Sequence, residues 1–276
     1  MDLVLTFDRT SDVSKLEGCN TRGVAYRWDI FQRWLRRIPS GSSALDFGAG
    51  SLRESFDLVQ RGFCVTSVDN DISVLEAYKA KYQWPNALHE VVAAPDLETA
   101  LAKLGDRKFS LILCFDVLEH LADPAPTLKE LARRLDENGL LFVTVPNGWT
   151  LFELAFRINL ILANVTGRSF RPGEPHLQMN SPAAWRTLLD RGGFKILEHE
   201  MQIGFFANTA AALIQLPLLL GGRLARRFGV KVDAEALAAR LYGGPQAHLM
   251  ELLDRRTKPL LNRLYAWNLF VLEKAT

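Results

Sequence analysis

The stretch Leu45-Asp46-Phe47-Gly48-Ala49-Gly50 decides the fold of this 276-residue chain. Its apolar residues predict a buried strand, and the two glycines predict a tight turn into a helix that begins near Ser51. Because Gly48 and Gly50 carry no side chain, a ligand can lie directly against the backbone, near the positive end of the helix dipole. We therefore expect a ligand-binding loop at the carboxyl end of this strand.

A second apolar strand, Val65-Thr66-Ser67-Val68-Asp69, ends in an acid nineteen residues after Gly50. A carboxylate in this place can accept hydrogen bonds from both hydroxyls of a ribose. Dinucleotide-binding loops carry a third glycine three residues after the second one, where this chain has Arg53. Asp46 also places a negative charge beside the loop, where it would repel a pyrophosphate. These features favour a ligand that combines a ribose with a cationic group, such as S-adenosylmethionine.

Two further motifs follow along the chain, Phe109–Leu121 (FSLILCFDVLEHL) and Gly139–Asn147 (GLLFVTVPN). With these motifs and the two strand ends described above, the chain resembles the class I S-adenosylmethionine-dependent methyltransferases. The resemblance runs from about Ser43 to Glu200 and resumes at the C-terminal strand. It implies S-adenosylmethionine as the cofactor.

The order of the apolar runs agrees with this resemblance. Strands are predicted near 44–47, 63–68, 88–93, 109–114 and 139–145, and helical stretches separate them. Such alternation is typical of a parallel sheet with helices on both faces. We therefore predict an α/β fold with a doubly wound, mostly parallel, seven-stranded sheet of Rossmann-like type. Its last strand is expected to be antiparallel and to follow a helical insertion.

We expect the chain to divide into four segments. These are an N-terminal helical cap at 1–42, a cofactor-binding core at 43–204, a helical insertion at 205–264 and the final strand of the core sheet at 265–276. The insertion begins with a strongly apolar run that basic residues follow. Three interpretations of it stay open: a lid over the substrate pocket, a peripheral membrane contact through 205–227, or a dimer contact. The sequence does not fix the oligomeric state.

The cofactor is expected to contact the turns that follow the first four strands. The residues predicted to bind it are Asp46, Gly48, Ala49, Gly50, Asp69, Asn70, Asp96, Leu97, Phe115 and Asp116. In the resembling family an acid after the third strand commonly accepts a hydrogen bond from the adenine amino group. The matching position in this chain is Ala94, so Asp96 is displaced and could equally be a helix N-cap.

The motif around the fourth strand also carries the candidate chemistry. Asp116, Glu119 and His120 fall within one helical turn of sequence, and His176 follows later. This spacing resembles the metal-dependent branch that includes the ubiquinone-pathway catechol O-methyltransferases. That resemblance implies a divalent cation such as Mg²⁺ on these four residues, although Asp116 stands where those enzymes usually carry glutamate. The alternatives are a metal-free site with His120 or His176 as the base, or a purely structural role.

Composition narrows the class of acceptor. The net charge of +2 argues against a nucleic-acid partner, and three scattered cysteines predict free, buried thiols in a reducing, cytoplasmic compartment. We expect O-methylation of a small or lipid-like molecule, with Glu119, His120 and His176 as the catalytic candidates. N- or C-methylation remains an alternative, and so does a non-catalytic regulatory protein that binds S-adenosylmethionine. Association with a membrane would follow from the alternative interpretation of the insertion.

Overall fold

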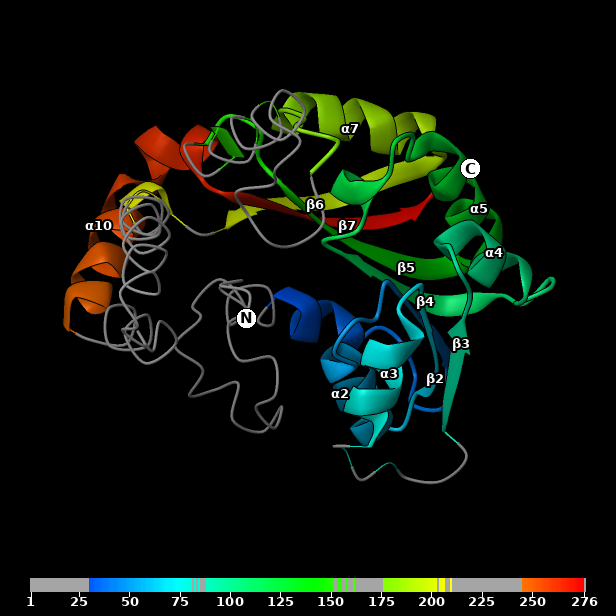
Figure 1. Ribbon diagram of the computed structural model, residues 1–276. Coiled ribbons are helices and arrows are strands. Elements are labelled where there is room, and N and C mark those ends of the chain that lie inside the picture. The colour runs from blue at the N-terminus through cyan, green and yellow to red at the C-terminus, as the bar shows by residue number, and fades with distance from the viewer. Residues whose placement is uncertain are drawn as a thin grey trace, which may run out of the picture.

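The structure, a computed structural model, describes residues 30–80, 82, 84, 88–150, 153–154, 157, 161, 176–202, 204–206, 209 and 245–275. Within these ranges seven strands form one sheet in the order β3-β2-β1-β4-β5-β7-β6 (Figure 1). The strands are β1 (Ser43–Phe47), β2 (Cys64–Asp69), β3 (His89–Ala93), β4 (Phe109–Phe115), β5 (Leu135–Pro146), β6 (Phe194–Gln202) and β7 (Trp267–Lys274). The pairs among β1 to β5 are parallel, whereas β7 runs antiparallel to both β5 and β6. The predicted fold class is confirmed.

The strand order reverses beside β1. The chain runs outward through β1, β2 and β3, and then returns to place β4 on the other side of β1. Ligands of such sheets bind outside the carboxyl ends of the strands at this reversal. The loops after β1 and β4 therefore flank the place where a cofactor is expected.

Helices cover both faces of the sheet, as Figure 1 shows. They are α2 (Arg53–Gln60), α3 (Ile72–Lys79), α4 (Leu97–Ala102), α5 (Ala125–Arg134), α7 (Pro182–Arg191) and α10 (Pro245–Leu261), with the 3-10 turns η2 (Leu118–His120) and η3 (Asn262–Leu264). Ile112 of β4 packs into one core with Leu128 of α5 and Trp185 of α7. Its neighbour Leu111 packs into a second core with Phe31 and Leu58. This alternation follows from the period of two in a strand, and it divides the core into two layers.

Two expectations about the strands are corrected. β5 begins at Leu135, not near 139, because Leu135 pairs with Phe109 before an irregularity shifts the register. Cys64 is exposed because it is the first residue of β2, whereas Cys114 is buried as predicted. The strand predicted near 139–145 left out the polar run Asp136–Asn138, but the structure places this run inside the strand.

The predicted insertion at 205–264 is described only in part. α10 contacts the chain just after β6, where the carboxylate of Asp254 accepts a hydrogen bond from the Phe206 N–H at 2.8 Å. Residues 210–244 lie outside the described residues, so the lid, membrane and dimer interpretations stay predictions, as does the division into four segments. Among the described residues, no helix has the length and apolar character that crossing a membrane requires.

Candidate active site

The glycine loop after β1 lies against the loop after β4. Gly48 has a φ of +77°, and a β-carbon added there would lie 2.2 Å from Cγ2 of Val117. The N–H groups of Gly48 and Ala49 both donate to the carbonyl oxygen of Val68, at 2.8 and 3.0 Å. Glycine is therefore required at position 48 for two reasons, its backbone conformation and the close approach of Val117.

Asp69, at the end of β2, is in contact with the same loop. Its Oδ2 accepts a hydrogen bond from the Gly50 N–H at 2.7 Å, and its Oδ1 accepts one from the Asp71 N–H at 3.0 Å. These two backbone bonds fix the orientation of the carboxylate. An ionised carboxylate offers about four lone-pair positions, so Asp69 retains capacity to accept from ribose hydroxyls. The two strand ends that the sequence singled out thus form one structural unit.

Asp46 is buried directly before the loop. Its Oδ2 accepts a hydrogen bond from the Ser55 hydroxyl at 2.5 Å. Burial is the main cause that raises the pKa of Asp46 to about 7, and the nearby charge of Glu54 adds to it. A cationic ligand beside this carboxyl would favour its ionised form. The position is therefore suited to a ligand that carries positive charge.

The other predicted cofactor residues differ in their surroundings. The carboxylate of Asp96 accepts hydrogen bonds from the N–H and the hydroxyl of Thr99, at 2.7 and 2.8 Å, and so caps α4. Asn70 and Asp96 are exposed, whereas Leu97 and Phe115 are half-buried. The N-cap alternative accounts for the Asp96 side chain, and its contact with adenine stays a prediction.

Asp116 differs from the predicted set of metal ligands. Its φ is +57°, and its Oδ1 accepts hydrogen bonds from the Thr144 hydroxyl at 2.8 Å and from Nε1 of Trp267 at 3.0 Å. These contacts direct the carboxylate toward β5 and β7. Asp116 is accordingly not part of the group of possible metal ligands that the described residues form. Asp116 thus lies outside this group, and a metal ion on the other three residues stays a prediction.

The three remaining candidates lie together at the carboxyl end of β4. Glu119, His120 and His176 each offer a ligand atom, and these atoms lie within 4.8 Å of one another. The rings of His120 and His176 meet edge to face, with centroids 5.0 Å apart. The carbonyl oxygen of Glu119 accepts hydrogen bonds from the N–H groups of Leu177 and Gln178, at 2.7 and 2.9 Å. These bonds bring the later histidine to the motif after β4.

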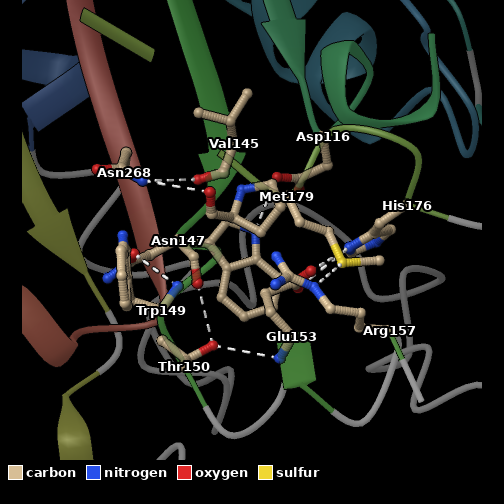
Figure 2. A network of polar contacts seen from close by, with 12 residues as sticks. Asp116, Val145, Asn147, Trp149, Thr150, Glu153, Arg157, His176, Met179 and Asn268 are labelled. Atoms are coloured by element: carbon tan, nitrogen blue, oxygen red, sulfur yellow. Dashed lines mark hydrogen bonds and ion pairs between the residues drawn. The ribbon is translucent and has the colours of Figure 1, made fainter. Parts of the chain in front are cut away.

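Glu153 is a site residue that the sequence analysis missed. Its two carboxylate oxygens lie 3.0 and 2.9 Å from Nδ1 of His176, and its residue is only 1% exposed (Figure 2). It stands alone as an acid in the apolar run Leu151–Phe156 (LFELAF). A single carboxylate in such a run needs a partner, because burying an unpaired charge is costly. That signal was available, but the sequence could not show which residue the partner is.

A family model described as a methyltransferase domain matches residues 22–199, which is more than half of the chain. The chain belongs to the class I S-adenosylmethionine-dependent methyltransferases. Curated relatives of this methyltransferase include the ubiquinone biosynthesis O-methyltransferases of Pseudomonas entomophila (strain L48) and Glaesserella parasuis serovar 5 (strain SH0165). The first is 30% identical over 149 residues, which are 51% of this chain and 57% of the relative. The second is 28% identical over 109 residues, which are 39% and 46%. The chain thus spans about half the length of the curated relatives it matches.

Solved structures of proteins with different activities share the fold. Magnesium protoporphyrin IX methyltransferase from Synechocystis PCC 6803 with bound SAH has a TM-score of 0.51 and 18% identity, covering 92% of this chain and 84% of that chain. Coclaurine N-methyltransferase has a TM-score of 0.53 and 15% identity, covering 90% and 72%. The [4+2]-cyclase SpnF has a TM-score of 0.51 and 14% identity, covering 87% and 76%. The fold alone therefore does not determine the reaction.

The donor set of this methyltransferase does not match the predicted Mg²⁺. Mg²⁺ is bound mainly by oxygen atoms, whereas the group here offers one carboxylate and two imidazoles. Two histidines and a glutamate suit a borderline cation such as Zn²⁺. If these residues bind a metal ion, their donor atoms suit a cation of this kind better than Mg²⁺.

Proposed function

We propose that this methyltransferase transfers a methyl group from S-adenosylmethionine to a hydroxyl of a small or lipid-like molecule. The observation that supports this proposal is the pair of adjacent rings of His120 and His176, which lies just after Val117, the residue that meets Gly48 of the glycine loop. Methyl transfer to a neutral hydroxyl releases a proton, so a base in reach of the acceptor is needed. The names of the curated relatives, ubiquinone biosynthesis O-methyltransferases, agree with oxygen as the acceptor atom.

Different residues of the chain bind the cofactor and remove the proton of the acceptor. S-adenosylmethionine supplies, when bound, a methyl group that a sulfonium has already activated. Asp46 and Asp69 together with the glycine loop hold the charged and ribose parts of the cofactor. His176 takes the proton of the acceptor hydroxyl on a ring nitrogen. Alignment is the main contribution of the protein, since a well-oriented pair of reactants can gain roughly 7–11 kcal/mol over free encounter.

An exposed apolar side chain next to His176 in the chain supports an apolar acceptor. Leu177 follows His176 directly and is 44% exposed. Large exposed apolar side chains beside a site are suited to bind an apolar part of a ligand. The peripheral membrane contact through 205–227 stays a prediction, because 210–227 lies outside the described residues.

A second candidate mechanism uses a metal ion on Glu119, His120 and His176. It is supported by the distances among their ligand atoms and by the Glu153 carboxylate on His176, since metal-binding histidines usually donate their other N–H to such a group. The ion would lower the pKa of the acceptor hydroxyl, so that no side-chain base is needed.

The test is methyl transfer by the purified protein. Methyl-labelled S-adenosylmethionine would be incubated with a panel of catechols, phenols, aliphatic alcohols and amines, and the products identified by mass spectrometry. We expect O-methylated products, and their loss in His176→Ala. Products methylated only at nitrogen or carbon would overturn the proposed acceptor atom. The same labelled cofactor would also be incubated with the protein in cell extract. If the protein binds the cofactor but neither the panel nor the extract yields a labelled product, a non-catalytic binding protein is favoured.

A further inference from the structure

The turn that precedes the helical residue Glu153 is fixed on two sides. The Asn147 side-chain amide donates to the carbonyl oxygens of Arg263 and Tyr265, at 2.8 Å each, just before β7. The Gly148 N–H donates to the carbonyl oxygen of Asn180 at 3.0 Å. A β-carbon on Gly148 would lie 2.2 Å from the carbonyl oxygen of Met179, so this turn and the segment after His176 are in direct contact. Glu153 and His176 are therefore held together by backbone contacts on both sides.

Capping of the helix does not explain why Glu153 is buried. Thr150 and Glu153 have the spacing of a capping box, in which the acid would accept from the N–H of the threonine. Here the Thr150 N–H donates to the carbonyl oxygen of Asn147 at 3.2 Å, and the Glu153 carboxylate contacts His176 instead. A buried carboxylate is costly to desolvate and is weak evidence for stabilisation. Its contact with an imidazole of the candidate site points to a functional reason.

The contact with Glu153 determines which ring nitrogen of His176 carries the hydrogen. An ionised carboxylate can only accept hydrogen bonds, so Nδ1 of His176 must carry a hydrogen. In the neutral ring the lone pair is then on Nε2. The other ring nitrogen is thereby the one that can accept a proton or bind a cation. Figure 2 shows the side chains of Glu153 and His176 facing each other, although the two residues are 23 positions apart in the sequence.

We propose that Glu153 is a positioning residue of the active site, which fixes His176 as the Nδ1–H tautomer with its lone pair on Nε2. The part of this inference that concerns methyl transfer, a ring nitrogen of His176 acting as the base, rests on the proposed function. The tautomer itself is a property of the protein alone. Its test therefore succeeds or fails independently of any acceptor or cofactor.

The test is long-range ¹H–¹⁵N NMR of the histidine rings at pH 8.5, well above the ordinary imidazole pKa. The chain has five histidines, and His176→Gln identifies the signal of interest by its disappearance. Wild-type protein should show His176 with hydrogen on Nδ1 and the lone pair on Nε2. In Glu153→Leu, which cannot accept a hydrogen bond, and in Glu153→Gln, which can also donate one, the Nε2–H tautomer should appear.

The matched control is Glu137→Gln, the same change on an exposed residue near the amino end of β5. It should leave the His176 signal unchanged. Finding the Nε2–H tautomer in wild-type protein, or an unchanged tautomer in both Glu153 variants, would overturn the inference. Folding of each variant is checked from the signal of His199, whose ring nitrogen contacts Asn268 at 3.0 Å elsewhere in the fold.

A kinetic readout then separates positioning from a structural role. With any acceptor that the panel identifies, Glu153→Gln should lower kcat by at least roughly 10–100-fold, the range found when a metal-binding histidine loses the carboxylate that orients it. The dissociation constant for S-adenosylhomocysteine should stay within about twofold, and Glu153→Asp, which keeps the charge, should recover part of kcat. An unchanged kcat in Glu153→Gln, or a loss confined to cofactor binding, would contradict the positioning role.

Discussion

The substitution Gly48→Ala tests the contact between the loops after β1 and β4, and Gly41→Ala is its matched control. Both glycines have a positive φ, +77° and +86°, but a β-carbon at position 41 meets nothing within 4 Å, whereas one at position 48 lies 2.2 Å from Cγ2 of Val117. Backbone strain alone costs about 1–2 kcal/mol in either variant. The overlap at position 48 adds about 1–3 kcal/mol, because a packed neighbour must move. We therefore expect a loss of about 1–2 kcal/mol for Gly41→Ala and about 2–5 kcal/mol for Gly48→Ala.

The free energy of unfolding is measured by urea denaturation, and cofactor affinity by calorimetry with S-adenosylhomocysteine. Gly48→Ala should weaken binding as well as stability, whereas Gly41→Ala should affect stability alone. The double variant Gly48→Ala/Val117→Ala removes the overlapping methyl group. It should be more stable than the sum of the two single losses in unfolding free energy implies. The difference gives the interaction free energy between the added β-carbon and the Val117 side chain. Equal losses in Gly48→Ala and Gly41→Ala, together with unchanged affinity, would refute this reasoning.

Two further predictions concern charge and metal. Because burial raises the pKa of Asp46 to about 7 in the folded protein, whereas the unfolded chain releases this proton near the ordinary pKa of 3.8, the free energy of unfolding should fall as pH rises through this window. The shift corresponds to a loss on the order of 4 kcal/mol, which Asp46→Asn should abolish. Binding of cationic S-adenosylmethionine should release a proton near pH 6–7, measured as a buffer-dependent enthalpy in calorimetry; no difference between buffers would count against an interaction with Asp46. For the metal, a chelator should leave activity unchanged if His176 acts as a base. Loss of activity with a chelator and its recovery with Zn²⁺ would instead favour the metal mechanism, and Glu119→Ala should then abolish the recovery.

The features that local sequence determines were predictable. The glycine turn, the acid at the end of β2 and the period of two in the strands each reflect a backbone or packing requirement that a few neighbouring residues satisfy. The position of Asp69 beside the glycine loop was also predictable, because the carboxyl ends of neighbouring parallel strands meet at one edge of the sheet. The fold class followed from the order of these features along the chain.

The features that depend on contacts between distant segments were not predictable. Asp116 is drawn toward Thr144 and Trp267, which follow it by 28 and 151 residues. Glu153 was overlooked because its partner, His176, lies 23 residues away beyond a polar stretch. The start of β5 depends on the pairing of Leu135 with Phe109, whereas the local sequence predicted the strand only from about Gly139. In each case a tertiary contact overrides or adds to the local pattern.

The most direct test of the central claim is calorimetric titration of S-adenosylhomocysteine into wild-type protein and Asp69→Ala. A hydrogen bond to a charged group contributes about 1.5–3 kcal/mol, so the loss of even one such bond in Asp69→Ala predicts a roughly 10–150-fold weaker affinity, with one site in the wild type. Asp123→Ala, which removes an exposed carboxylate that accepts from the Ala125 N–H, should bind as the wild type does. No binding by the wild type, or equal affinity in Asp69→Ala, would contradict the assignment of the glycine loop and Asp69 to the cofactor.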